Sequence, residues 1–203
     1  MPPKKMQIIN SKKGIEKAIT HLRDGGVLVY PTESSYGIGC RADDVIAVGN
    51  VFAFKERPVD KTVLILVPSV EVAKRLVKWS DKIQQLVDAH WPGQLSIVAQ
   101  ATAEGKLLAP GVVAKDGTIA LRMSPHPVAQ ALCEAVGPLV SSSANKGSEP
   151  PCYTLEEIKK WLHKEDDIMI LDGGDLQRKK PSTVVRVNGG ELTILRDGAV
   201  EIS

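Results

Sequence analysis

Residues 27–39 of this chain read VLVYPTESSYGIG, and this stretch indicates both the fold and the position of a site. Val27–Val29 is an apolar strand signal that runs directly into a turn of hydroxyl groups, one carboxylate and two glycines. In α/β proteins, such a junction brings polar side chains and backbone N–H donors to one place. We therefore expect a functional site at this turn. The alternative is a tight polar loop that satisfies its own hydrogen bonds.

Apolar periodicity places helices and strands around this stretch. Ile15, Ala18 and Leu22 have helical spacing after Ser11, and two glycines end that helix before the strand at 27–30. Further helices are expected from Asp43 or Asp44 to the Lys55 turn and near 69–77, 80–90, 127–136 and 154–163. Further strands are expected near 62–67, 95–101, 118–123, 139–142, 168–171, 183–187 and 192–196. This order predicts an α/β fold whose sheet has mixed parallel and antiparallel strands.

The composition limits the class of protein. With 203 residues, 43% hydrophobic and 25% charged, the chain fits one large globular domain over residues 1–203, with 1–10 as a flexible or edge segment. No apolar run is long enough to cross a bilayer, and no apolar segment follows the basic start. We therefore expect a cytoplasmic protein without a membrane partner.

Metal and nucleic-acid signals are weak. Cys40, Cys133 and Cys152 are widely spaced and odd in number, and the four histidines are scattered, so we expect neither a disulfide framework nor a metal site built from protein side chains. A net charge of +2 and 4% aromatic residues do not indicate a dedicated nucleic-acid binder.

Two cations, Lys55 and Arg57, stand one residue apart at a predicted helix end, directly before Pro58. A forked guanidinium beside a mobile ammonium suits neighbouring phosphate oxygens. The alternative is a pair of solvated cations favoured by the helix dipole. The sequence has neither a P-loop nor a Gly-x-Gly-x-x-Gly motif, so phosphate binding requires another design.

Two other strand ends carry polar groups. Arg122 is followed by a loop stiffened by two prolines, which suits a guanidinium held for a carboxylate; pairing with a surface acid is the alternative. Ser141, Ser143 and Asn145 follow another strand, without the Gly-x-Ser-x-Gly elbow of a serine nucleophile. We expect a structural role for His126. Glu33 either orients a substrate amine or a magnesium ion, or caps its own turn.

The turn motif, Pro31-Thr32-Glu33-x-x-Tyr36-Gly37-x-Gly39, resembles the signature loop of the YrdC-type threonylcarbamoyl-AMP synthases. The resemblance covers nearly the whole chain and is closest to the short, single-domain form. The motifs that continue it, in the family's order, are Lys55-Glu56-Arg57-Pro58, Trp91-Pro92-Gly93, Arg122-Met123-Ser124-Pro125-His126-Pro127, Ser143-Ala144-Asn145, Asp172-Gly173-Gly174 and Pro181-Ser182-Thr183-Val184-Val185.

The resemblance implies a twisted mixed sheet and a nucleotidyltransferase. The expected reaction combines L-threonine, bicarbonate and ATP into L-threonylcarbamoyl-adenylate and releases pyrophosphate, with Mg²⁺ arriving on ATP. The product would serve threonylcarbamoyladenosine modification of tRNA through partner transferases. Weak RNA binding is also implied, and a non-catalytic module that binds double-stranded RNA or tRNA is the alternative.

The resemblance also implies roles for individual residues. Lys55 and Arg57 are expected to be catalytic, through stabilisation of the departing pyrophosphate. Residues expected to contact L-threonine are Thr32, Arg122 and Ser182. Residues expected to contact ATP are Lys55, Arg57, Thr118, Ser141, Ser143, Asn145 and Arg196.

The chain departs from the family pattern at two places. Thr62-Val63 stands where Pro-Leu is usual, and Gly147-Ser148 stands where Ser-Gly is usual. Both departures put the detailed geometry of the ATP contacts in doubt more than the substrate class.

Overall fold

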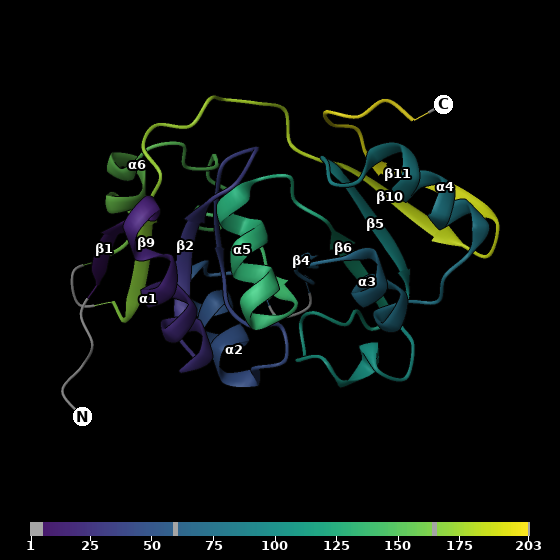
Figure 1. Cartoon of the computed structure of the whole chain (residues 1–203), viewed down its shortest axis with the longest axis horizontal. Helices are drawn as coiled ribbons and strands as arrows, with labels where there is room; N and C mark the ends of the chain where they lie inside the picture. The colour runs from purple at the N-terminus through teal and green to yellow at the C-terminus, as the bar shows by residue number, and fades with distance from the viewer. Residues whose placement is uncertain (1–5, 59–60, 164–165, 203) are drawn as a thin grey trace.

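The computed structural model describes residues 6–58, 61–163 and 166–202, which form two mixed β-sheets flanked by helices (Figure 1). This confirms the expected α/β class with parallel and antiparallel strands. The strands are divided between two sheets, and the division creates the space for the site described below.

The first sheet has the strand order β1-β9-β2-β3-β8. β9 pairs in parallel with β1 and β2, whereas β2–β3 and β3–β8 are antiparallel. Its strands are β1 (Gln7–Asn10), β9 (Ile168–Asp172), β2 (Val27–Pro31), β3 (Tyr36–Gly39) and β8 (Ser142–Ser143).

The second sheet has the strand order β11-β10-β5-β6-β4-β7. β10–β5 and β6–β4 are parallel pairs, and the other three pairs are antiparallel. Its strands are β11 (Glu191–Arg196), β10 (Thr183–Asn188), β5 (Leu95–Gln100), β6 (Thr118–Arg122), β4 (Ile65–Leu66) and β7 (Leu139–Val140).

Most helices begin at a side-chain cap, because a side-chain oxygen satisfies a backbone N–H of the first turn. Asn10, Asp44, Ser69, Ser80 and Thr154 all accept such a bond, and Thr154 with Glu157 completes the expected capping box. The helices are α1 (Ser11–Arg23), α2 (Val45–Phe54), α3 (Val70–Leu76), α4 (Asp81–His90), α5 (Pro127–Val136), α6 (Leu155–Lys159) and the 3₁₀ helix η1 (Gly105–Leu107).

Strand β2 is buried on both faces, which explains its unbroken apolar sequence. Leu28 and Tyr30 belong to a cluster formed with α1 and α5, which pack side by side over the first sheet (Figure 1). Val27 and Val29 belong to the larger core that includes residues of α2, α4 and the second sheet. The strand that leads into the signature turn is therefore fixed from both sides.

The two sheets meet at residues 139–143. The sequence predicts one strand over 139–142, but β7 pairs with β4 in the second sheet and β8 pairs with β3 in the first. Ser141 lies between them, and its backbone N–H donates to the Leu64 carbonyl at 2.8 Å. A single segment thus ties both sheets together and presents Ser141–Ser143 at their junction.

Several predicted boundaries are wrong. The strand expected at 62–67 pairs only at Ile65–Leu66, and the helix expected to reach 163 ends at Lys159. Tyr36–Gly39, interpreted as loop, is strand β3. Residues 7–10 form an edge strand, which is one of the two alternatives expected for residues 1–10; residues 1–5 of that segment lie outside the described residues. None of the helices in the described part of the chain is long and apolar enough to cross a membrane.

Candidate active site

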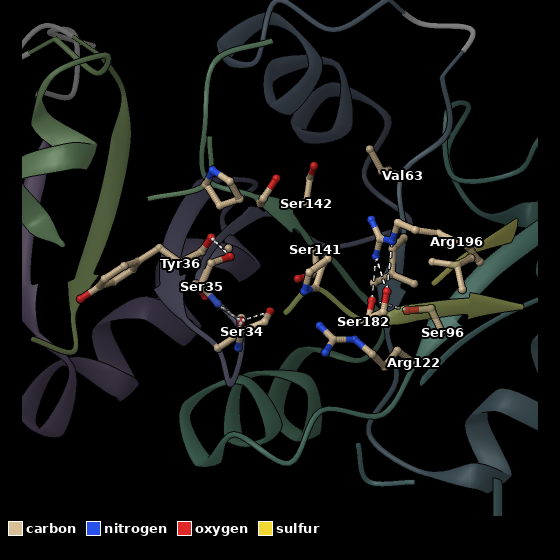
Figure 2. Close-up of a pocket in the computed structure, with 18 of the residues that line it drawn as sticks. Ser34, Ser35, Tyr36, Val63, Ser96, Arg122, Ser141, Ser142, Ser182 and Arg196 are labelled. Atoms are coloured by element: carbon tan, nitrogen blue, oxygen red, sulfur yellow. Dashed lines mark hydrogen bonds between the residues drawn. The ribbon is translucent and has the colours of Figure 1, made fainter. Parts of the chain in front are cut away.

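A cavity of about 490 Å³ lies at the junction of the two sheets. Figure 2 shows Ser34, Ser35 and Tyr36 on one side of it, Arg196, Ser182 and Ser96 on the other, and Ser141 between them. The volume falls in the range of small-molecule and cofactor sites. The predicted site residues among its lining are Thr32, Arg57, Arg122, Ser141, Ser143, Ser182 and Arg196.

The signature turn forms the wall on the first sheet. The hydroxyl of Thr32 donates to the Ser35 carbonyl at 2.6 Å, and the Thr32 N–H donates to the same oxygen at 3.1 Å. The turn therefore does satisfy its own hydrogen bonds, as the alternative interpretation proposed. Thr32, Ser34 and Ser35 nevertheless line the cavity, so the closed turn also presents hydroxyl groups to a ligand.

Gly39 permits the two sheets to approach each other next to this wall. A Cβ atom at position 39 would overlap the Val140 carbonyl oxygen. The second glycine of the signature loop is therefore required by close backbone contact across the junction, in line with the general use of glycine at close approaches.

Arg122 ends β6, and its guanidinium reaches toward Ser141 in the cavity (Figure 2). The residue is only 4% exposed, and burial lowers its pKa to about 10, so it stays protonated at neutral pH. It pairs with the Glu33 carboxylate, and Ser124 donates to that carboxylate at 2.5 Å. The Glu33 carboxylate is thus bound to residues of other segments, which does not support the turn-cap alternative.

The second sheet supplies a serine pair and another guanidinium. Arg196 donates through Nη2 to the Ser182 carbonyl at 2.7 Å and to the Ser182 hydroxyl at 3.0 Å. That hydroxyl also lies 3.0 Å from the hydroxyl of Ser96. Burial lowers the pKa of Arg196. Ser96 on β5 was missed by the sequence analysis, because nothing in the strand pattern distinguishes it from a core serine.

Arg57 lines the cavity from the turn after α2. Its Nε donates to the Lys61 carbonyl at 3.0 Å and its Nη2 to the Thr62 carbonyl at 2.7 Å, so the guanidinium is held in one orientation. Burial lowers its pKa as well. Three guanidinium groups, those of Arg57, Arg122 and Arg196, therefore converge on one cavity.

Lys55 occupies a different position from the one expected of a phosphate ligand. It is 2% exposed, and its Nζ donates to the Ser143 carbonyl at 2.6 Å and to the Asn145 carbonyl and Oδ1 at 2.9 and 3.0 Å. Three acceptors use all three N–H donors of an ammonium group. Lys55 and Asn145 lie behind the lining and fix the loop that carries Ser143.

Thr118 also lies outside the cavity lining. It begins β6, whereas Arg122 at the other end of that strand lines the cavity. Its hydroxyl donates to the Asp116 carboxylate at 2.7 Å. The contact of Thr118 with ATP stays a prediction.

His126 caps α5 by accepting the Val128 N–H, which confirms its structural role.

Among the described residues, no group of three or more His, Cys, Asp and Glu side chains is arranged to hold a metal ion. Guanidinium groups, of which three line the cavity, are suited to binding phosphate oxygens. Sequence reasoning missed the lining residues Tyr153 and Lys179. Tyr153 lies just before α6, and Lys179 lies in the segment between β9 and β10. Lys179 belongs to a short basic run, which was the available signal.

Fold and site together define an α/β protein with a cavity at the junction of two sheets whose three guanidinium groups suit a small anionic ligand, without a P-loop. The chain belongs to the Sua5/YciO/YrdC family: residues 20–198 match its family model, which is described as "Telomere recombination".

Curated relatives and solved structures agree with this assignment. The chain is 33% identical over 190 residues to a threonylcarbamoyl-AMP synthase of Vibrio campbellii, covering 92% of this chain and 100% of that protein. A Klebsiella pneumoniae threonylcarbamoyl-AMP synthase is 33% identical over 184 residues, covering 89% and 94%.

Two solved structures share the fold. E. coli YciO superposes with a TM-score of 0.82 at 29% identity, covering 98% of this chain and 97% of that one. P. abyssi Sua5 complexed with L-threonine superposes with a TM-score of 0.84 at 28% identity. This chain covers only 57% of the length of that Sua5 chain.

Proposed function

We propose that this protein is a nucleotidyltransferase that makes L-threonylcarbamoyl-adenylate from L-threonine, bicarbonate and ATP, with release of pyrophosphate. The observation that carries the proposal is one cavity lined by two guanidinium groups from separate elements, Arg122 at the end of β6 and Arg57 after α2. The curated relatives that match nearly the whole chain are named for this product.

The threonine side of the cavity is assigned to Arg122, Thr32 and Ser182. A guanidinium binds a carboxylate through two parallel N–H bonds, and Arg122 is protonated and held at the end of a strand. The hydroxyl of Thr32 lines the cavity from the signature turn and that of Ser182 from the side of the second sheet, and both can exchange their present partners for the polar groups of the amino acid. The L-threonine named for the bound Sua5 structure supports this assignment.

The ATP side is assigned to Arg57, Arg196, Ser141 and Ser143, which line the cavity at the sheet junction. Lys55 and Asn145 act through the loop that they hold. Mg²⁺ would arrive bound to the phosphates of ATP. Bound there, it would withdraw charge from the pyrophosphate leaving group.

The chemistry follows from positioning. The amine of threonine and bicarbonate form a carbamate with loss of water. A carbamate oxygen then forms a bond to the α-phosphorus of ATP, and the bond from that phosphorus to the bridging oxygen breaks. The electron pair leaves on pyrophosphate, where Arg57 stabilises the added charge. Burial of the carbamate between two sheets would limit its hydrolysis, so no strong side-chain base is required.

The product would be consumed by transferases that modify tRNA to threonylcarbamoyladenosine, which implies a cytoplasmic location with tRNA. Weak RNA binding fits this place in the sequence of reactions. The relatives support the synthase and give no support to a non-catalytic RNA-binding module.

Calorimetry in carbon dioxide-free buffer tests the two-ligand cavity without turnover. Threonine should bind more tightly when ATP is present, and ATP should tighten by the same factor when threonine is present, because coupling between two sites is reciprocal. The variant Arg122→Lys should weaken threonine while leaving ATP unchanged. Salt-dependent RNA affinity without ATP binding would contradict the proposal and favour the RNA-binding module.

A further inference from the structure

Glu33 and Ser124 form a buried layer behind Arg122. One carboxylate oxygen of Glu33 pairs with Nη1 of Arg122, and the other accepts the Ser124 hydroxyl at 2.5 Å. The backbone N–H of His126 in turn donates to that hydroxyl at 3.1 Å. The residues are well shielded, since Ser124 is 1% exposed and the Glu33 side chain 11% exposed.

This layer stands outside the cavity. Arg122 lines the cavity, whereas neither Glu33 nor Ser124 does. The carboxylate therefore contacts the guanidinium without itself lining the ligand space. A guanidinium has five N–H donors in a rigid plane. In Arg122, Nε and Nη1 are buried and Nη1 faces Glu33, so Nη2 is the nitrogen left for a ligand.

The contacts restrict both partners. An arginine side chain has many rotamers, and a fixed carboxylate beside it reduces that freedom before a ligand arrives. Ser124 fixes the second oxygen of Glu33, and so fixes the plane of the carboxylate. The chain of contacts begins at the N-terminus of α5, which is anchored by His126.

The charges are also balanced. Glu33 neutralises a buried cation whose isolation would be costly. Arg196 is near enough to help lower the pKa of Arg122 by charge repulsion. Arg57 and Arg196 also line the cavity, so it keeps positive charge for an incoming anion although Arg122 is paired with Glu33.

We infer that Glu33, itself held by Ser124, is a positioning residue that fixes the Arg122 guanidinium for the carboxylate of the amino-acid substrate. The inference rests on the proposed function, because it assumes that Arg122 binds that carboxylate. This positioning role differs from the amine-binding and magnesium-binding roles that the place of Glu33 in the signature turn suggests, because both carboxylate oxygens already bind Arg122 and Ser124.

Variants of both residues test the inference by calorimetry and steady-state kinetics. Glu33→Gln should weaken L-threonine binding and raise the KM for threonine at least about tenfold, with ATP affinity and kcat within about twofold of the unsubstituted protein. Ser124→Ala, which keeps both charges, should cause a smaller loss in the same direction. Glu33→Asp should restore part of the affinity. The matched control is Glu191→Gln, an exposed carboxylate on β11.

A double variant shows whether Ser124 acts through Glu33. Adding Ser124→Ala to Glu33→Gln should cause little further loss of threonine affinity, because coupled residues are not additive. Where Glu33→Gln does not fold, Ser124→Ala decides alone. Threonine binding that is unchanged or tighter in the folded variants would overturn the inference, and tighter binding would identify Glu33 as an occupant of the substrate position. Absence of threonine binding by the unsubstituted protein would instead overturn the proposed function, and this inference with it.

Discussion

Replacement of Lys55 by methionine tests how the Ser143 loop is held. Lys55 is 2% exposed and donates to three oxygens of residues 143 and 145. Methionine is similar in length and apolar, so it fills the same space but supplies no donor. The variant removes three hydrogen bonds to the loop, leaving Asn145 Oδ1 only the Ser143 hydroxyl, and should weaken ATP binding because the Ser143 loop is less firmly held.

The magnitude follows from the burial of the ammonium group. Burial, aided by the neighbouring Arg57, lowers the pKa of Lys55 from 10.5 to about 8. A difference of this size corresponds to about 3 kcal/mol. Below pH 8 both folded and unfolded chains are protonated at this position, and the folded state bears the whole cost of the buried charge.

The sign of the pH dependence is determined by proton binding. Between pH 8 and 10.5, the folded state has released the Lys55 proton while the unfolded chain still holds it, so stability from this group rises with pH and is lost as pH falls through 8. The free energy of unfolding of the unsubstituted protein minus that of the Lys55→Met variant should therefore increase by about 2 kcal/mol between pH 7 and pH 9.5. The buried thiols of Cys40 and Cys133, whose pKa values are raised by burial, act in the opposite direction. They are common to both proteins and cancel in the difference.

Urea unfolding followed by circular dichroism at pH 7, 8, 9 and 9.5 gives this difference directly. A difference that does not change with pH would refute the burial and loop-holding role of Lys55. A variant that keeps full ATP affinity would refute the link between Lys55 and the Ser143 loop.

Three other substitutions test separate parts of the site. Arg57→Lys should lower turnover about ten- to a hundredfold, because a forked charge-assisted contact is worth about 1.5–3 kcal/mol; wild-type rates of pyrophosphate release would remove Arg57 from the phosphate site. Arg122→Lys should raise the KM for threonine by a similar factor, measured at saturating ATP, and an unchanged KM would place the carboxylate elsewhere. Gly39→Ala should destabilise the fold by about 3 kcal/mol in urea unfolding, because the added Cβ overlaps the Val140 carbonyl, whereas Gly190→Ala, where a Cβ meets nothing within 4 Å, should be close to neutral. Equal stability of the two glycine variants would contradict the close approach of the sheets.

Local signals in the sequence predicted the elements with strong periodicity or caps. The spacing after Ser11, the serines at 69 and 80 and the Thr154 capping box each identify a helix that the structure contains. Strand β2 was predicted because its residues are apolar without interruption, and its burial on both faces is the reason.

Tertiary contacts determine the features that were missed. Tyr36–Gly39 contains two glycines and has weak strand propensity, yet it pairs with both β2 and β8. The strand at 139–142 divides because its two halves find partners in different sheets, and no local pattern records that division. Strand β4 is short because only Ile65–Leu66 lies between partners.

The sequence predicted which residues line the candidate site better than it predicted how their side chains are oriented. Seven of the predicted residues line one cavity, because strand ends from both sheets meet there. The orientation of Lys55 into the loop, and of Glu33 toward Arg122, depends on which groups lie opposite in the folded chain. Those partners are separated by 88 or more positions in the sequence, so local motifs contain no information about them.

Release of pyrophosphate from ATP is the measurement that tests the central claim most directly. Four reactions in carbon dioxide-depleted buffer compare ATP alone, ATP with L-threonine, ATP with bicarbonate, and ATP with both. The proposed function predicts pyrophosphate only when threonine and bicarbonate are present together, and a matching amount of adenylate product. Pyrophosphate release that persists when either one is omitted would contradict it.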